Sequence, residues 1–244
     1  MPFAYGGGKA VVMVPETRVT QRALDGRQFV LSGPFDLGGP FTSTVEVSVN
    51  GRRHELTAGL ARLGDAVAEA LGIDRFDEEF NHQGGTLLTA RTQPYDAGIR
   101  LREDRLTGVW RGRRYGLVTQ MYRATTSQLL AVLRNLRISE YDDGLVVRPT
   151  GGSSFATPAT VTGQVPGLGL LEISPLTAQH ATQLPRWRGL TTRAGELFRD
   201  TLTDGSPYFV LVTEDTWITV LPLPDTVLDQ VPEMVGRLRL HPAA

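Results

Sequence analysis

Short runs in which apolar residues alternate with polar ones, or cluster with β-branched ones, dominate the start of the chain. They occupy residues 10–15, 29–32 and 43–49, and Asn50-Gly51 supplies a turn before 52–56. Period-two alternation places one face of a strand against a core, and Asn-Gly is a strong hairpin signal. The pattern therefore predicts a β-rich opening.

The period then changes to that of a helix. Apolar residues recur at helical spacing from Thr57, which can cap a helix, to Gly72, which can supply a left-handed residue at its end. A second helix is expected after Thr125 or Thr126, with its apolar stripe running from Leu129 to Leu136 and its end at Ile138. Between the two helices, strands are expected over residues 86–90, 99–110 and 115–122.

A Gly/Ser/Pro-rich stretch follows these elements. Its composition predicts a linker over residues 147–156, between an N-terminal domain of residues 1–146 and a smaller C-terminal domain of residues 157–244. In the second domain we expect a short helix capped by Asp229, with Pro232 in its first turn. Strands are expected there over residues 169–173, 208–212 and 217–221.

Residues 115–138 and 217–240 show the same order of strand, turn and amphipathic helix. The identities at this offset are sparse, and duplication competes with chance recurrence of a common α/β arrangement. The expected fold is α+β, with antiparallel sheets each packed by amphipathic helices, in two related tandem domains. The matching pairs are Val118/Val220, Gln128/Gln230, Leu136/Leu238 and Arg137/Arg239.

The order of elements in residues 1–140 resembles the PsbP-like (Mog-type) α/β fold. The resemblance begins with an early strand that ends at Val14-Pro15-Glu16 and includes the Gly84-Gly85 turn, an antiparallel hairpin and a closing helix. This family includes small actinobacterial lipoproteins and cytoplasmic chaperones that hold the ends of secreted effectors. The resemblance implies a binding scaffold without catalytic machinery, and it transfers no active-site residue. The chain departs from the family at Thr17, where many relatives carry tryptophan, and it has no cysteine for a lipid anchor.

Composition narrows the classes of function. The formal net charge of −1 gives no overall field for nucleic acid or an anionic membrane, and no apolar run is long enough to span a membrane. The absence of cysteine excludes disulfides and a thiolate nucleophile, and it fits a reducing compartment. Lys9 is the only lysine among 25 basic residues, which is typical of GC-rich, actinobacterial-type coding. We expect a cytoplasmic protein with no membrane partner.

Catalytic motifs are largely missing. The Gly6–Lys9 run lacks the spacing and the hydroxyl of a phosphate loop, so a flexible arm is expected there. Glu79 and His82 stand three apart but have no second pair with which to hold a metal. Ser153 and Ser154 lie in the linker, outside any nucleophile elbow. The sequence predicts no catalytic residue, no metal site and no cofactor.

Basic and aromatic residues gather within the segment Arg100–Arg123. We expect a hairpin turn there that carries Arg111, Arg113 and Arg114 beside Trp110. Guanidinium groups bind carboxylates and phosphates in bidentate fashion and stack on aromatic rings, which suits an acidic partner or a nucleic-acid backbone. A solvated hairpin partly neutralised by neighbouring acids is the alternative interpretation.

A second candidate site is Trp187, flanked by Arg186 and Arg188 in a stretch bounded by proline and glycine. An exposed Trp-Arg loop is typical of an interface anchor. The favoured interpretation is a non-catalytic adaptor, chaperone or assembly component that binds another protein through an exposed aromatic and arginine surface. The sequence leaves the oligomeric state open.

Two other functions compete with this interpretation. The first is an enzyme with a site between the domains, using Glu78 and Glu79 or Glu196 and Asp200. The second, less favoured, is binding of a nucleic-acid backbone by the Arg100–Arg123 hairpin.

Overall fold

The structure is a computed structural model that describes residues 16–96, 98, 100–224 and 226–242. The Gly6–Lys9 arm and the strand expected over residues 10–15 lie outside the described residues. Of the described residues, 50% lie in strands and 14% in helices. The expected α+β fold, with sheets packed by amphipathic helices, is therefore wrong, because large antiparallel sheets dominate and the helices are few and short.

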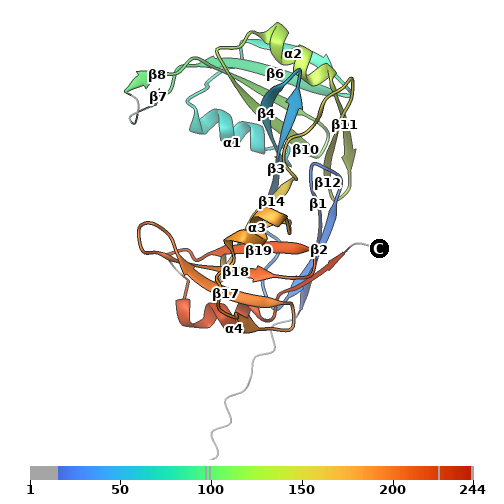
Figure 1. The fold of residues 1–244 in the computed structure, drawn as a ribbon. Helices are drawn as coiled ribbons and strands as arrows, with labels where there is room; N and C mark the ends of the chain where they lie inside the picture. The colour runs from blue at the N-terminus through green and yellow to red at the C-terminus, as the bar shows by residue number, and fades with distance from the viewer. Residues whose placement is uncertain (1–15, 97, 99, 225, 243–244) are drawn as a thin grey trace, which may run out of the picture.

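The N-terminal half forms one wing of a large antiparallel sheet (Figure 1). We call these strands the first wing. From the outer edge to the centre they are β5 (Glu78–His82), β6 (Gly85–Thr92), β9 (Arg105–Arg111), β10 (Tyr115–Tyr122), β4 (Arg52–Leu60) and β3 (Phe41–Val49).

The C-terminal half supplies the second wing in the mirrored order. At the centre, β3 pairs with β14, so one sheet continues across both halves. Figure 1 shows the two wings above and below this central pair. From the centre outward the second wing contains β14 (Thr160–Val165), β15 (Gly169–Pro175), β19 (Thr216–Leu221), β18 (Pro207–Val212), β17 (Glu196–Thr201) and β16 (Leu190–Thr191).

A smaller sheet joins the two wings along one side (Figure 1). Its order is β11 (Leu136–Tyr141), β12 (Gly144–Pro149), β1 (Thr17–Arg22), β2 (Gln28–Gly33) and β20 (Arg239–Pro242). In this sheet β2, which leads into the first wing, pairs with β20, which follows the second wing. Conversely, β12 leads toward the second wing and pairs with β11, which follows the first.

The segment expected as a linker carries structure. Residues 147–149 end β12, and β13 (Ser154–Phe155) pairs with β3. The intervening Gly151 and Gly152 are exposed and have positive φ angles of 60° and 84°. Whether residues 1–146 and 157–244 fold as separate domains stays a prediction.

The order of elements repeats in the two halves. From β3 and from β14 onward, each half has two strands, a helix, four strands, a second helical segment and a closing strand. The helices of the first half are α1 (Leu63–Ala70) and α2 (Thr126–Arg134), and those of the second half are α3 (Ala178–Gln183) and η1 (Leu228–Gln230) with α4 (Val231–Val235). The first half also carries a small hairpin, β7 (Tyr95–Asp96) with β8 (Leu101–Arg102), between β6 and β9.

Several helix boundaries differ from the expectation. Thr57 caps no helix, because it lies in β4 opposite Thr44 and Val118, and α1 begins at Leu63. The second helix ends at Arg134, and Ile138 belongs to β11. Asp229 is not a cap either, since α4 begins after Gln230 without a side-chain cap.

Other local signals are confirmed. Thr125 forms a capping box with Gln128 at the start of α2, which satisfies backbone amides that the first helical turn leaves without partners. Gly72 follows α1 with a φ of 66°, and its amide donates to the Glu69 carbonyl at 3.0 Å. Asn50 and Gly51 both have positive φ, as a tight hairpin between β3 and β4 requires.

The two faces of the large sheet bury apolar side chains differently. One face contributes to the main core, which also contains residues of the small sheet and α2. The other face carries two separate clusters. The first is Leu88, Val109 and Val118, covered in part by Leu63 and Val67 of α1, and the second is Phe198, Val210 and Trp217, bordered by Leu176 and Leu184 at the ends of α3.

Candidate protein-binding surface

The three tryptophans have different environments. Trp110 is 3% exposed, and its Nε1 donates to the His82 carbonyl at 2.7 Å. Trp217 is also buried and stacks on His180, with ring centroids 4.7 Å apart. Trp187, in contrast, is 63% exposed. Trp110 is therefore a core residue and cannot be part of a binding surface, whereas Trp187 remains a candidate.

The hairpin arginines are largely neutralised by nearby acids. Arg111 pairs with Asp65, and its guanidinium lies 5.6 Å from the centroid of the Phe76 ring. Arg114 pairs with Asp142. Among the residues that the structure describes, the Arg113 side chain has neither an ion pair nor a hydrogen bond.

Glu140 holds the hairpin turn from the neighbouring β11. Its carboxylate accepts hydrogen bonds from the backbone amides of Arg113 at 3.0 Å, Tyr115 at 2.9 Å and Arg114. Burial acts to raise the pKa of Glu140, but the amide bonds from Arg114, Arg113 and Tyr115 outweigh it and hold the pKa below its ordinary value. The Glu140 carboxylate therefore holds the backbone of the turn that carries the arginines.

The rest of the Arg100–Arg123 segment is partly neutralised, although Arg102 and Arg123 have no ion pair with the described residues. Arg105 pairs with Glu103, and Asp104 pairs with Arg91. Alternating charges of this kind give a weaker field than a continuous basic patch. The nucleic-acid hypothesis has a separate test. It predicts salt-sensitive retention on DNA or RNA, and replacing Arg111, Arg113 and Arg114 by alanine should abolish this retention.

The loop that carries Trp187 is fixed at both ends. Before it, Leu184 packs against the cluster that contains Trp217. After it, the Gly189 amide donates to Glu196 Oε1 at 2.7 Å, and a Cβ at Gly189 would lie 2.7 Å from the Leu197 carbonyl oxygen. Because a loop anchored in this way loses little conformational entropy on binding, it suits an interface.

Trp187 does not stand alone on this surface. Arg186 and Arg188 are exposed and, within the described part of the chain, neither guanidinium has an ion pair or a hydrogen bond. Leu190, in β16, is 58% exposed. We call Arg186, Trp187, Arg188 and Leu190 the Trp187 surface.

The adjoining sheet edge is partly open. β16 is only two residues long and pairs with Glu196 and Leu197 of β17. Among the described residues, no strand pairs with the outer side of β17 from Phe198 to Thr201. Open edges present unpaired backbone groups to which a partner strand can bind.

The carboxylates that the enzyme hypothesis requires do not come together. Glu78 and Glu79 are consecutive residues of β5, so their side chains point to opposite faces, and Glu196 and Asp200 lie four residues apart in the extended strand β17. Glu78 accepts hydrogen bonds from Thr89 and Thr126, and Asp200 accepts one from the Thr201 amide at 2.8 Å. Among the described residues, no three His, Asp or Glu side chains are grouped so that they could hold a metal ion.

Comparisons of the chain with protein-family models, with curated proteins and with solved structures found no match. The resemblance to the PsbP-like fold stays a prediction. Within the ranges that the structure describes, no helix has the length and apolar character needed to cross a membrane.

Proposed function

We propose that this protein is a non-catalytic, cytoplasmic protein-binding adaptor, acting as a chaperone or assembly component, and that Trp187 anchors its partner. The observation that carries the proposal is a tryptophan 63% exposed on a loop that is fixed at both ends. A folded protein gains little from leaving so large an apolar side chain in water, whereas a partner that covers it removes that area from solvent.

The composition of the Trp187 surface supports the same conclusion. Tryptophan and arginine are the side chains most enriched among residues that dominate binding energy. Arg186 and Arg188 have no acidic partner among the described residues, so their charges are available to carboxylates of another protein. The open edge of β17 beside this surface offers backbone groups for additional contacts.

The first experiment identifies the partner. The tagged protein is cross-linked in cells of its native host, purified with and without nuclease, and its partners are identified by mass spectrometry. A stoichiometric protein that survives nuclease is then purified, and its dissociation constant is measured against wild type and variants.

The decisive comparison is between two exposed aromatic residues. Trp187→Ala is expected to weaken binding by about 30-fold or more, the loss that follows from removing an interface anchor. Tyr95→Ala is the matched control, because Tyr95 is 59% exposed on the β7–β8 hairpin of the other half, and it is expected to bind as wild type does. Thermal unfolding verifies that both variants fold.

Equal affinities of Trp187→Ala and wild type for the purified partner would exclude Trp187 as the anchor. Recovery of the protein alone, with no stoichiometric partner, would contradict the adaptor function itself.

A further inference from the structure

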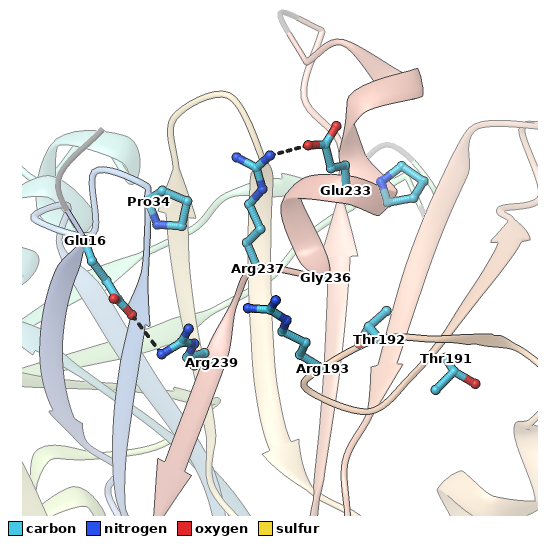
Figure 2. Close-up of a pocket in the computed structure, with 10 residues that line it drawn as sticks. Glu16, Pro34, Thr191, Thr192, Arg193, Glu233, Gly236, Arg237 and Arg239 are labelled. Carbon is cyan, nitrogen blue, oxygen red and sulfur yellow. Dashed lines mark hydrogen bonds and ion pairs between the residues drawn. The ribbon is translucent and has the colours of Figure 1, made fainter. Parts of the chain in front are cut away.

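A cavity of about 1060 Å³ lies in the second half, beside the turn between β16 and β17. Its volume is close to the upper end of the range for small-molecule sites, roughly 300–1,000 Å³. The cavity is bordered by that turn, by α4, and by the residues at the starts of β1 and β20. Figure 2 shows the guanidiniums of Arg193 and Arg239 extending into the same space, whereas Arg237, which also lines the cavity, turns toward Glu233.

The cavity has a surplus of positive charge. Arg237 pairs with Glu233, and Arg239 Nη1 lies 3.6 Å from Glu16 Oε1. The guanidinium of Arg193 has no ion pair and no hydrogen bond to the residues that the structure describes. The three guanidiniums and two carboxylates that line the cavity leave a net charge of +1, which the side chain of Arg193 carries without a partner among the described residues.

The first half shows how the corresponding position can be closed. There the turn between β5 and β6 inserts Gln83 against the junction of α2 and β11. Gln83 Nε2 donates to the Leu136 carbonyl at 2.7 Å and to the Leu133 carbonyl at 3.3 Å, and its Oε1 accepts from the Ile138 amide at 2.9 Å. One neutral side chain thus bridges that junction and satisfies the main-chain groups around it.

Among the described residues of the second half, no turn side chain forms the corresponding hydrogen bonds. In its corresponding turn, the Thr192 side chain bonds within the turn itself, to the Gly195 carbonyl at 2.9 Å. The next residue, Arg193, extends into the cavity instead. At the helix-to-strand junction, the offset of 102 aligns Asn135 with Arg237, so the second half has a cation where the first has an amide.

We propose that this cavity binds a small oxyanion, a phosphate or a polycarboxylate, through Arg193 and Arg239. A guanidinium presents a planar pair of donors that matches carboxylate and phosphate oxygens, and such charge-assisted bonds are about twice as strong as neutral ones. The bound anion offsets the surplus charge that the two carboxylates leave. This site is distinct from the Trp187 surface and does not require a protein partner.

The test is a calorimetric titration of the full chain with two probes, inorganic phosphate and citrate, at constant ionic strength set with chloride. Saturable binding of either probe is expected, and the stronger of the two identifies the ligand class. Arg193→Gln is expected to weaken binding by about tenfold or more, as the loss of a charged hydrogen-bond donor does.

The matched control is Arg113→Gln. It removes the same formal charge from an exposed arginine whose side chain also has no ion pair, but it lies in the other half. It is expected to leave the affinity unchanged, and so is Trp187→Ala, which separates this site from the proposed adaptor surface. Absence of saturable binding of both probes up to about 10 mM, where even weak sites are occupied, overturns the proposal. So does an equal loss in Arg193→Gln and Arg113→Gln, which indicates general electrostatic attraction only.

Discussion

Arg22 and Asp143 lie 121 residues apart in the chain, yet Arg22 Nε donates to Asp143 Oδ1 at 2.8 Å. The Arg22 amide also donates to the Asp143 carbonyl at 2.9 Å, and the side chain of Gln28 donates to the same carboxylate. The Arg22 guanidinium lies 4.6 Å from the centroid of the Tyr141 ring. These contacts tie β1 and β2 to the turn between β11 and β12, where β1 and β12 form a parallel pair with a single register match.

Replacing Asp143 by asparagine is expected to lower the free energy of unfolding at pH 7 by about 1–3 kcal/mol, because charge-assisted hydrogen bonds are lost at a partly buried site. Burial acts to raise the pKa of Asp143, but the bonds from Arg22 and Gln28 and the Arg22 charge outweigh it and hold the pKa below its ordinary value. A carboxyl whose pKa is lower in the folded state stabilises the fold above its unfolded pKa and loses that contribution as pH falls through the folded value.

The measurement is urea unfolding of wild type and Asp143→Asn between pH 7 and pH 3. The difference between them is expected to shrink below about pH 4 as the wild-type carboxyl takes up its proton. Asp142→Asn is the control, since the neighbouring carboxylate is 91% exposed and its loss is expected to change stability little. A difference for Asp143→Asn that stays constant across this range would contradict the electrostatic explanation.

The strands with one buried face could be predicted from the sequence. In β3, buried and half-buried residues alternate along all nine positions, which is the pattern that residues 43–49 show. The Asn50-Gly51 turn and the Thr125 cap were also predictable, because each depends on a local backbone preference.

Other elements depend on partners distant in the chain. Leu136 and Ile138 fit both a helical stripe and a strand face, and pairing with β12 is what makes them β11. The edge strand β5 has exposed positions and no clear apolar pattern, so the sequence does not predict a strand there. Pairing with β6 gives this segment its structure.

Some features of the candidate sites also follow from local sequence, and others depend on residues distant in the chain. The exposure of Trp187 follows from local signals, the flanking arginines and the loop formers around them. Trp110 faces the core because of its register in β9, which the chain alone does not specify. Arg237 and Arg239 are near neighbours in the chain, but Arg193 lies in the turn between β16 and β17, and only the fold brings it to the same cavity.

Gly85 is required by its contact with Trp110. A Cβ at this position would lie 2.4 Å from the Arg111 carbonyl oxygen and 2.5 Å from the Trp110 ring. Gly85→Ala is therefore expected to destabilise the protein by about 1–3 kcal/mol, as overpacking of a core does. Urea unfolding followed by tryptophan fluorescence measures the effect.

Gly116 in β10 is the matched control for this substitution. The nearest atom to its Cβ position is the Ala61 carbonyl oxygen at 3.4 Å, which is ordinary contact. Gly116→Ala is expected to leave stability unchanged or to raise it slightly. Alanine lowers the conformational entropy of the unfolded chain, so less entropy is lost on folding. Equal losses in the two variants would show that the packing of Trp110 is not the cause.

Glu46 and Glu55 stand directly opposite each other on β3 and β4. Arg53 Nη1 lies 3.4 Å from Glu46 Oε2, but Glu55 has no cation partner among the described residues. Like charges at directly opposed positions repel, so Glu55→Gln is expected to stabilise the protein by about 0.5 kcal/mol at low salt. The gain should decrease as added salt screens the repulsion.

Urea unfolding at low and high salt tests this prediction. Glu172→Gln is the control, because Glu172 faces Thr162 and Thr219 across its two neighbouring strands. It is expected to change stability little at either salt concentration. A loss of stability in Glu55→Gln would mean that Glu55 makes favourable contacts that outweigh the repulsion from Glu46.

In the small sheet, β2 of the first half pairs with β20 of the second half. This pairing predicts the result of cleaving the chain between the halves. A specific protease site inserted between Gly151 and Gly152 lies in an exposed turn, where a Cβ at Gly152 meets nothing within 4 Å. After cleavage, β2 of the N-terminal fragment still pairs with β20 of the C-terminal fragment, and β3 still pairs with β13 and β14. The fragments are therefore expected to elute together at the intact mass in gel filtration.

Denaturant is expected to separate the cleaved fragments in a single unfolding transition that lies below that of the uncleaved protein, because association of two chains costs entropy that the covalent link avoids. The uncleaved protein with the same insertion is the control for the added residues. Two separate, soluble and cooperatively folded fragments at native pH would show instead that each half is stable alone, and that the central β3–β14 pair contributes little to the stability of either.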